Sequence, residues 1–420
     1  MPLRLGCSLA TSPDSAVHAA EAERLGYQRV WLYDSPALYP DVWMLLTECA
    51  LATSTIRLGP AVLVPSLRHP MVNASAITQL CRLAPGRVQV AVGSGLTGQV
   101  TIGRGPLPWS LVRAYTLAVR GLCDGATVDW EGARLRLIHP PGFGAPQPLG
   151  VEWFIGAAGP KGYEVAAEIA DGALARVPVL GVQHSIVNTF GTVRGTDEPF
   201  DSPRIVAAAG HLASLVLHNM IQRGRGDVAE HEGGREWLAA YAAIDPAERH
   251  LALYEQHLVG VPERDRPVLT AEFMRRNAGA RTAGEWHAWF DEQVAGGATE
   301  VSYQPAGPDI PGELARFAEV FRTKTRDEWC AIMEGTDVCF APVLSITEAP
   351  KHPHAIARNA FTEAAGMVQP SPAPRFSRTP GAIQSNPAHA GQHTAEVLAF
   401  AGGHELILPR LAPSPLDRTD

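Results

Sequence analysis

The sequence predicts an α/β fold, a closed (β/α)8 TIM barrel with a helical insertion late in the barrel and a small irregular C-terminal appendage. Over roughly the first three hundred residues, short β-prone runs alternate with amphipathic helices, which is typical of βα units around a parallel sheet. The 420 residues exceed the roughly 250 to 300 that one barrel needs. From about Ala315 the repeating pattern gives way to a proline-rich stretch. One barrel and one smaller unit account for these three observations.

The first four βα units follow one another without interruption, because each β-prone run is succeeded by apolar residues at helical spacing. The strands are predicted at Leu3 to Leu9, Arg29 to Tyr33, Ile56 to Val64 and Arg87 to Val92. The helices are predicted at Ser15 to Leu25, Asp41 to Ala52, Met71 to Leu83 and around Ser110 to Leu122.

The second half of the barrel begins after an excursion. Residues Thr127 to Leu137 alternate and turn at Glu131-Gly132, which predicts a hairpin outside the barrel. The run WFIGAAGPKGYEVAAEIADGAL, Trp153 to Leu174, supplies strand five, helix five and the start of strand six. The remaining candidates are two strands, Arg204 to Ala209 and Glu300 to Gln304, and a closing helix, Gly312 to Phe321.

A long polar and helical insertion separates the last two candidate strands. Its run from Gly224 to Gly234 predicts a polar loop, and Arg235 to Ala243 and Ala283 to Val294 predict amphipathic helices. We therefore expect a barrel over 1–321 with an insertion at about 220–295, a second segment over 322–402, and a tail over 403–420.

The turn after strand five has the composition of an anion site. Gly156 and Gly159 permit a sharp turn, and Pro160 suits the first helical position. Ala157, Ala158 and Gly159 are small, so an anion could approach the unpaired amides of the helix that carries Lys161. An ordinary strand-to-helix turn has the same composition, so both interpretations stay open.

In a (β/α)8 barrel the active site lies at the carboxyl ends of the strands. This rule selects Ser8 to Thr11, Asp34 and Ser35, Ala61 to Pro65, Gly93 to Gly98, Ala157 to Pro160, and Arg176. Gly93, Gly95 and Gly98 match G-x-G-x-x-G, but the motif follows the fourth strand and no helix is expected directly after it. We interpret Gly93, Ser94 and Gly95 as a glycine-lined wall beside a flat ligand.

Composition excludes several classes of protein. Hydrophobic residues make up 46% and charged residues 19%, as in a globular protein with a sizeable core. A net charge of -8 argues against a nucleic-acid surface. No apolar run of roughly 18 residues predicts a membrane span, and the N-terminus lacks a signal-peptide pattern. We expect a cytoplasmic protein with no nucleic-acid or membrane partner.

Cysteine and histidine spacing predicts no metal site. The six cysteines form no C-x-x-C pair, so we expect reduced, mostly structural thiols. The closest histidine pair, His352 and His354, flanks Pro353, which opposes a helix that could aim both rings at one ion.

Four stretches follow one another in a characteristic order and spacing: LGPAVLVPSLRHP (Leu58 to Pro70), GRVQVAVGSG (Gly86 to Gly95), IGAAGPKGYEVAAEIADGAL (Ile155 to Leu174) and ATEVSYQPAGPD (Ala298 to Asp309). Together they resemble the luciferase-like monooxygenase superfamily and its deazaflavin-dependent reductases. The resemblance implies a non-prolyl cis peptide at Ala61 to Val62, which would bulge against a flavin or deazaflavin ring. It also implies that Ala157 to Lys161 hold the phosphate of the cofactor.

The same resemblance implies hydride transfer between the cofactor and a small-molecule substrate. Coenzyme F-420 is the expected cofactor, and FMN, which would make the protein a monooxygenase, is the alternative. Asp34 and His69 are the candidates for polar contacts to the ring or the substrate; alternatively, Asp34 caps a loop and His69 only starts a helix. A catalytically silent barrel that serves as an interaction module is a further alternative.

Three stretches of the C-terminal quarter form a second group: Phe321 to Phe361, Gln369 to Gly381 and Gly391 to Phe400. They resemble a different family, the class III CoA-transferases. Within them we expect a helix start at Thr325 to Trp329, a strand at Asp337 to Val343 and an extended segment at Gln369 to Pro380. The catalytic and CoA-binding parts of that family have no counterpart here, so His352, His354 and Arg375 match no catalytic position. The resemblance favours an acyl-CoA or lipid-derived substrate, and the barrel family suggests a homodimer.

Overall fold

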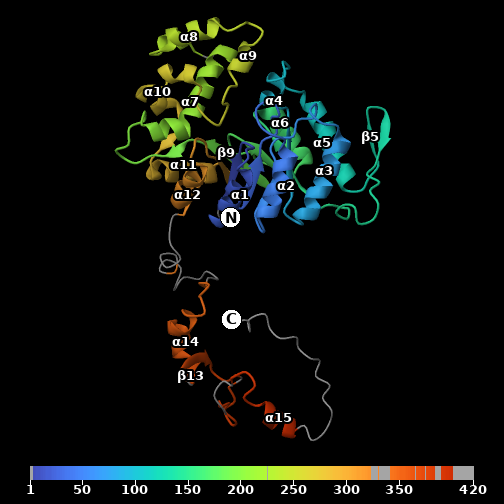
Figure 1. Ribbon diagram of the computed structural model, residues 1–420, viewed down its shortest axis with the longest axis vertical. Helices are drawn as coiled ribbons and strands as arrows, with labels where there is room; N and C mark the ends of the chain where they lie inside the picture. The colour runs from blue at the N-terminus through green and yellow to red at the C-terminus, as the bar shows by residue number, and fades with distance from the viewer. Residues whose placement is uncertain are drawn as a thin grey trace, which may run out of the picture. The chain divides into compact units, whose positions relative to one another are not determined.

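The computed structural model divides into two compact units, Met1–Thr323 and Lys324–Asp420 (Figure 1). The structure describes residues 3–224, 226–322, 330, 341–364, 366–373, 375–383 and 389–400. Each unit is described by itself below.

The first unit is a barrel of parallel strands in sequential order. Seven neighbouring pairs form one continuous sheet with the order β3-β2-β1-β12-β9-β8-β7-β4. Two bridges, Leu58 with Val88 and Leu63 with Val92, join β3 to β4 and close the ring. The eight strands are β1 (Arg4–Leu9), β2 (Arg29–Leu32), β3 (Arg57–Pro60), β4 (Gln89–Gly93), β7 (Glu152–Gly156), β8 (Gly172–Ala175), β9 (His184–Phe190) and β12 (Glu300–Gln304). The predicted fold class is confirmed.

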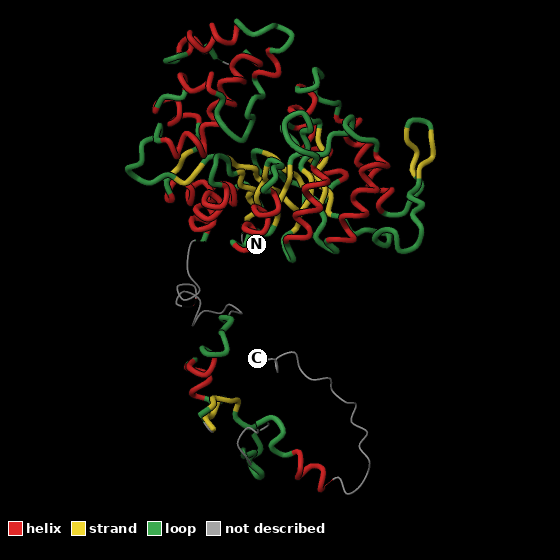
Figure 2. The backbone as a smooth tube through the Cα atoms, viewed as in Figure 1, coloured by secondary structure: helices red, strands yellow, loops and turns green. Residues whose placement is uncertain are grey.

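Helices surround this ring and bury their apolar stripes against it (Figure 2). They are α1 (Ser15–Arg24), α2 (Val42–Ala52), α3 (Pro70–Leu83), α5 (Trp109–Cys123), α6 (Pro160–Ile169), α11 (Ala283–Ala295) and α12 (Ile310–Phe321). Their starts follow the expected chemistry. The Asp41 side chain accepts from the amides of Trp43 and Met44, and prolines occupy the first turns of α3 and α6.

The predicted seventh strand, Arg204 to Ala209, is wrong. These residues begin α7 (Pro203–Arg223), where Ser202 caps the helix and accepts from the amide of Ile205. An apolar run such as IVAAA fits a buried helix as well as a strand, but Ser-Pro before it is a helix-start signal. The true seventh strand is β9, HSIVNTF, which pairs with β8 and β12.

A helical subdomain interrupts the chain between β9 and α11. It contains α7, η1 (Val228–Glu230), α8 (Gly234–Ala242), α9 (Arg249–Ala252), η2 (Glu263–Val268) and α10 (Ala271–Asn277). Its own core gathers apolar side chains from α7, α8, η2 and α10, separate from the barrel core. By length and composition α7 could cross a membrane, but half of that window is buried, as in the core helix of a folded domain.

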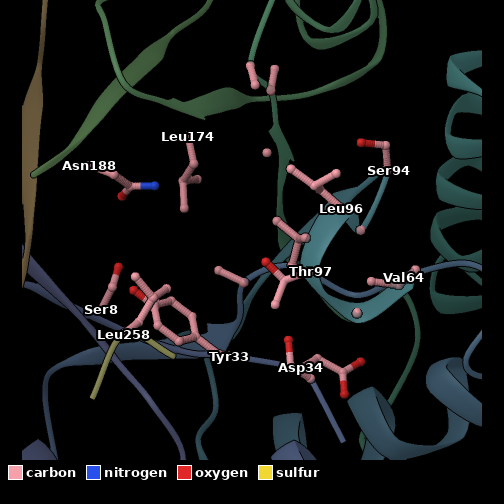
Figure 3. Close-up of a pocket in the computed structure, with 18 of the residues that line it drawn as sticks. Ser8, Tyr33, Asp34, Val64, Ser94, Leu96, Thr97, Leu174, Asn188 and Leu258 are labelled. Carbon is pink, nitrogen blue, oxygen red and sulfur yellow. The ribbon is translucent and has the colours of Figure 1, made fainter. Parts of the chain in front are cut away.

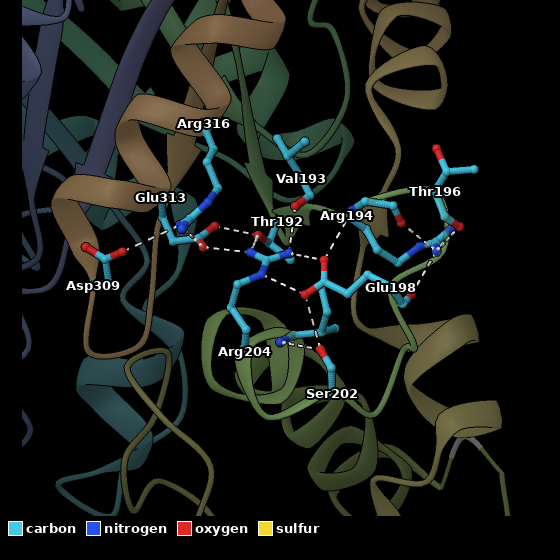
Figure 4. A network of polar contacts seen from close by, with 12 residues as sticks. Thr192, Val193, Arg194, Thr196, Glu198, Ser202, Arg204, Asp309, Glu313 and Arg316 are labelled. Atoms are coloured by element: carbon cyan, nitrogen blue, oxygen red, sulfur yellow. Dashed lines mark hydrogen bonds and ion pairs between the residues drawn. The ribbon is translucent and has the colours of Figure 1, made fainter.

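A polar network anchors this subdomain to the barrel (Figure 4). The Arg204 guanidinium on α7 pairs with Glu313 of α12 at 3.0 Å and with Glu198 at 2.6 Å. The buried Glu313 carboxylate also accepts from Thr192 in β10 (Thr192–Val193). The network therefore joins the start of α7 to the last helix of the barrel.

Two smaller elements lie between β4 and β7. The predicted excursion is a hairpin of β5 (Val128–Trp130) and β6 (Ala133–Leu135), with Glu131 and Gly132 at its turn. A single-turn helix, α4 (Leu96–Val100), begins within the glycine motif, and after it no helix begins before α5 at Trp109.

The second unit is small and largely exposed in its described part. It contains η3 (Ala349–Lys351), α14 (Pro353–Ala357), α15 (Thr394–Phe400) and a hairpin of β13 (Phe361–Ala364) and β14 (Met367–Pro370). Of the predicted extended segment, residues up to Pro370 belong to β14. The helix start expected at Thr325 to Trp329, and residues 337–340 of the expected strand, lie outside the described residues.

Candidate active site

A cavity of about 340 Å³ opens at the carboxyl ends of the barrel strands (Figure 3). Every barrel strand except β12 contributes to its lining directly or through the loop that follows it, and two residues come from the helical subdomain. The lining residues are Ser8, Tyr33, Asp34, Ser35, Tyr39, Ala61, Val62, Val64, Ser94, Gly95, Leu96, Thr97, Gly98, Gly156, Ala157, Ala158, Leu174, Ala175, Arg176, Asn188, Phe190, His257 and Leu258.

One wall of the cavity is built by the segment after β3. The Ala61–Val62 peptide bond is cis, as the resemblance implied, and both residues line the cavity. A Cβ at Gly156 would lie 2.3 Å from Val62 Cγ1, and one at Gly93 would lie 2.9 Å from Val62 Cγ2. The glycines therefore make room for the Val62 side chain.

Gly95, in the glycine motif after β4, likewise makes room for a valine side chain. A Cβ at Gly95 would lie 2.4 Å from Val64 Cγ1, so the absence of a side chain there lets Val64 pack. Ser94 and Gly95 line the cavity, whereas Gly93 lies behind Val62 and is not among the lining residues that the structure describes. Valine side chains, together with Leu96 and Thr97, form the wall that we expected from glycines.

The turn from β7 into α6 presents free backbone amides. The amide of Ala157 donates to Leu174 O at 2.9 Å, which fixes the turn against β8. Gly159 is the N-cap of α6 in an extended conformation, with no side-chain cap. A Cβ at Gly159 would meet no atom within 4 Å, and Lys161 is exposed. The turn thus has both the open space and the unpaired donors that an anion requires.

Asp34 is the buried carboxyl group of the cavity. Its Oδ2 pairs with Arg68 Nη1 at 2.5 Å, and Arg68 Nη2 pairs with Asp41 Oδ2 at 2.6 Å. Burial raises the pKa of Asp34, although the hydrogen bond and charge of Arg68 oppose that shift. A buried carboxyl group with a raised pKa can hold and release a proton next to a ligand.

His69 lies outside the cavity lining. Its ring is exposed and caps α3, with Nδ1 accepting from the amide of Met71 at 3.2 Å. This is the helix-starting role that the sequence left open. The structure therefore separates the two candidate polar residues, because only Asp34 faces the cavity.

The sequence reasoning missed a second wall, which the helical subdomain completes. Tyr39 Oη donates to the backbone oxygen of His257, and Gln304 Nε2 donates to Leu258 O at 2.9 Å. Tyr33 Oη in turn donates to Gln304 Oε1. These bonds hold the loop of His257 and Leu258 over the cavity, which stays open rather than filled by the insertion.

Asn188 and Phe190 were missed because strand seven was assigned to the wrong residues. Both side chains come from β9 and line the cavity. The rule of strand carboxyl ends would have selected them if HSIVNTF had been recognised as the strand. No sequence signal pointed to His257 and Leu258, whose position depends on tertiary contacts.

The described residues contain no group of three or more His, Cys, Asp or Glu side chains arranged to hold a metal ion. His352 caps α14, and its Nδ1 accepts from the amide of His354 at 3.3 Å. Arg375 Nη2 donates to the backbone oxygen of Asn359 at 2.7 Å. In the described part of the second unit, these polar residues have structural partners.

Two known families match different parts of the chain. Luciferase-like monooxygenase matches residues 9–187, and CoA-transferase family III matches residues 267–394, a range that begins inside the structural barrel. A 5,10-methylenetetrahydromethanopterin reductase from Archaeoglobus fulgidus is 33% identical over 158 residues, covering 36% of this chain and 46% of that protein. The mouse alpha-methylacyl-CoA racemase is 42% identical over 106 residues, covering 24% of this chain and 28% of that protein. The chain thus spans less than half the length of each relative.

Solved structures share the barrel fold at low sequence identity. The coenzyme F-420 dependent tetrahydromethanopterin reductase from Methanopyrus kandleri superposes with a TM-score of 0.53 at 17% identity, covering 76% of this chain and 98% of that one. An F-420-dependent secondary alcohol dehydrogenase gives a TM-score of 0.54 at 17% identity, with the same coverage of both chains. The family matches thus divide the chain into a part similar to luciferase-like monooxygenases, residues 9–187, and a part similar to CoA-transferase family III, residues 267–394.

Proposed function

We propose that the protein is an oxidoreductase that transfers a hydride between a deazaflavin, coenzyme F-420, and a small organic substrate. The observation that carries this proposal is the cavity at the strand ends, which is lined by Ala61 and Val62 and by Ala157 and Ala158 of the turn that leads to the open position of Gly159. Two solved proteins with F-420 in their names, a tetrahydromethanopterin reductase and a secondary alcohol dehydrogenase, share the barrel fold.

The residues present fit such a cofactor. A flat ring would lie against Ala61, Val62 and Leu174, and its phosphate would accept from the amides of Ala158, Gly159 and Lys161. The bound cofactor would supply the hydride. Asp34 would exchange the accompanying proton with the substrate oxygen, so that a carbonyl group is reduced to an alcohol as the cofactor is oxidised.

The second wall would keep water out of this reaction. Leu258 and Phe190 are apolar, and the bond from Tyr39 to the backbone of His257 holds the loop in place. Exclusion of water strengthens the electrostatic interactions of Asp34 with its ligand.

We further propose that the protein acts in the cytoplasm as a homodimer.

Absorbance and fluorescence titrations of the purified full-length chain with F-420 and with FMN test the proposal. Saturable binding of F-420, and its turnover with a carbonyl substrate, would support the reductase. Preferential binding of FMN would favour a monooxygenase instead. Binding of neither cofactor would refute the oxidoreductase and leave the barrel as an interaction module.

A further inference from the structure

Arg176, the first residue after β8, lies at the cavity without a counter-ion from the described chain. Its guanidinium carbon is 4.6 Å from the ring centroid of Phe190, and both residues line the cavity. Within the described ranges no carboxylate forms an ion pair with this guanidinium. A cation with this position and no partner is available to a ligand.

Three arginines of the first unit that pair with carboxylates show the contrast with Arg176, which is exposed. Arg29 pairs with Glu152 and Glu300, and Arg68 pairs with Asp34 and Asp41. Arg204 likewise pairs with Glu198 and Glu313. Each of these guanidinium groups is neutralised by two carboxylates, whereas the exposed guanidinium of Arg176 at the cavity keeps its charge for a ligand.

A second arginine increases the positive charge near Arg176. Partial burial lowers the pKa of Arg176; Tyr33 opposes this shift, and the charge of Arg281 adds to it. Arg281 stacks 4.7 Å from the Trp286 ring and, in the part of the chain that the structure describes, also forms no ion pair. Two like charges held near each other favour the binding of an anion.

An uncharged polar group lies on the same side of the cavity. Asn188 and Phe190 are two residues apart on β9, so their side chains point to the same face of the strand. Asn188 Oδ1 is buried and has no hydrogen-bond partner within the described chain. Figure 3 shows Asn188 facing Ser94, Leu96 and Thr97 across the cavity. A ligand donor would satisfy this oxygen.

We propose that the substrate carries a carboxylate, that Arg176 binds it with support from the charge of Arg281, and that Asn188 orients the adjoining polar group. This assignment rests on the proposed function and names its substrate class. The Phe190 contact turns Arg176 toward β9, whereas the turn proposed for the cofactor phosphate follows β7. The bound carboxylate is therefore distinct from the cofactor phosphate.

Calorimetric titration of the full-length chain, with and without its cofactor, tests this assignment. The probes are acetate, 4-oxopentanoate and octanoate, each paired with its neutral amide. We expect at least one acid to bind about tenfold more tightly than its amide, and Arg176→Gln to remove that preference. Arg134→Gln on the exposed β6 strand removes the same charge far from the barrel mouth and should leave the preference intact.

The outcomes separate this assignment from the proposed function. If no acid binds more tightly than its amide, or if Arg176→Gln keeps the preference, the assignment is wrong. If Arg176→Gln instead weakens cofactor binding, Arg176 serves the cofactor and the assignment is also wrong. A carboxylate preference in a chain that binds neither F-420 nor FMN would uphold the anion site and refute the oxidoreductase.

Discussion

Asp34 combines burial, a single ion pair and a place in the cavity lining. If this carboxyl exchanges a proton during turnover, Asp34→Asn should lower kcat about 100-fold while leaving cofactor affinity within about threefold. Steady-state kinetics and a cofactor titration would measure the two effects separately.

Asp41→Asn is the matched control, because Asp41 also pairs with Arg68 but is more exposed and does not line the cavity. Asparagine remains a good helix cap, so α2 should persist. Equal activity of both variants and the unchanged protein would rule out a chemical role for Asp34.

Two glycines of the same strand-to-helix segment should respond differently to one added methyl group. Gly156→Ala places a Cβ 2.3 Å from Val62 Cγ1, so we expect a loss of about 1 to 3 kcal/mol in unfolding free energy. Gly159→Ala meets no atom within 4 Å and should preserve stability while weakening cofactor binding. Thermal melts and cofactor titrations distinguish the two; unaltered cofactor affinity in Gly159→Ala would argue against a phosphate at this turn.

At the scale of single elements, the buried Glu313 carboxylate connects α12 to α7 and β10. Glu313→Gln leaves the Arg204 charge without one of its two partners, so we expect a loss of about 2 to 4 kcal/mol in unfolding free energy. Chemical denaturation would measure this loss. Glu168→Gln removes the partner of Arg113 in a fully exposed pair and should leave the unfolding free energy nearly unchanged. Equal effects of both changes would contradict the structural importance of the Glu313 network.

The helical subdomain should lose stability in acid before the barrel does. Burial lowers the pKa of His211 to about 4, and burial with the charges of His218 and His211 lowers that of His257 to about 3. Both rings are neutral in the fold and protonate more readily when unfolded. Their contribution is therefore present above about pH 6.5 and is lost as the pH falls from there toward 4.

Hydrogen exchange or limited proteolysis between pH 7 and 4.5 would follow the acid response of this subdomain. His211→Gln, which does not titrate, should flatten the response, whereas the exposed His69 offers a matched control, His69→Gln. An unchanged pH profile in His211→Gln would show that other groups cause the acid sensitivity.

The elements differ in how far the sequence alone could predict them. Strands with flanking turn signals, such as Glu300–Gln304, and helices with caps, such as Val42–Ala52, were predicted to within a residue. Strand seven was missed because IVAAA suits two buried environments equally, and local pattern does not distinguish them. The residues of the site differ in the same way. Asp34 and Ala61 could be predicted from their places at strand ends, but the position of Leu258 depends on the folding of a distant loop.

At the scale of the whole molecule, the barrel core is complete without the C-terminal unit. The apolar cluster runs from Leu5 to Val320, and all of its members belong to the first unit. A chain ending at Arg322 should therefore keep its melting temperature within a few degrees and its cofactor affinity within about twofold. Calorimetry and titration of both chains would show this; lost cofactor binding on truncation would mean that the second unit contributes to the site.

The ring of strands is closed unevenly, since β3 and β4 meet through two bridges while the other neighbours share continuous ladders. The segment that follows β3 at this junction carries Ala61 and Val62. The amide of Leu63 donates from this segment to Ala91 O in β4 at 2.8 Å. Local opening of the barrel should begin at this junction between β3 and β4, beside the wall proposed to bind the cofactor ring. A bound cofactor would then stabilise the junction of β3 and β4, where two bridges take the place of a continuous ladder.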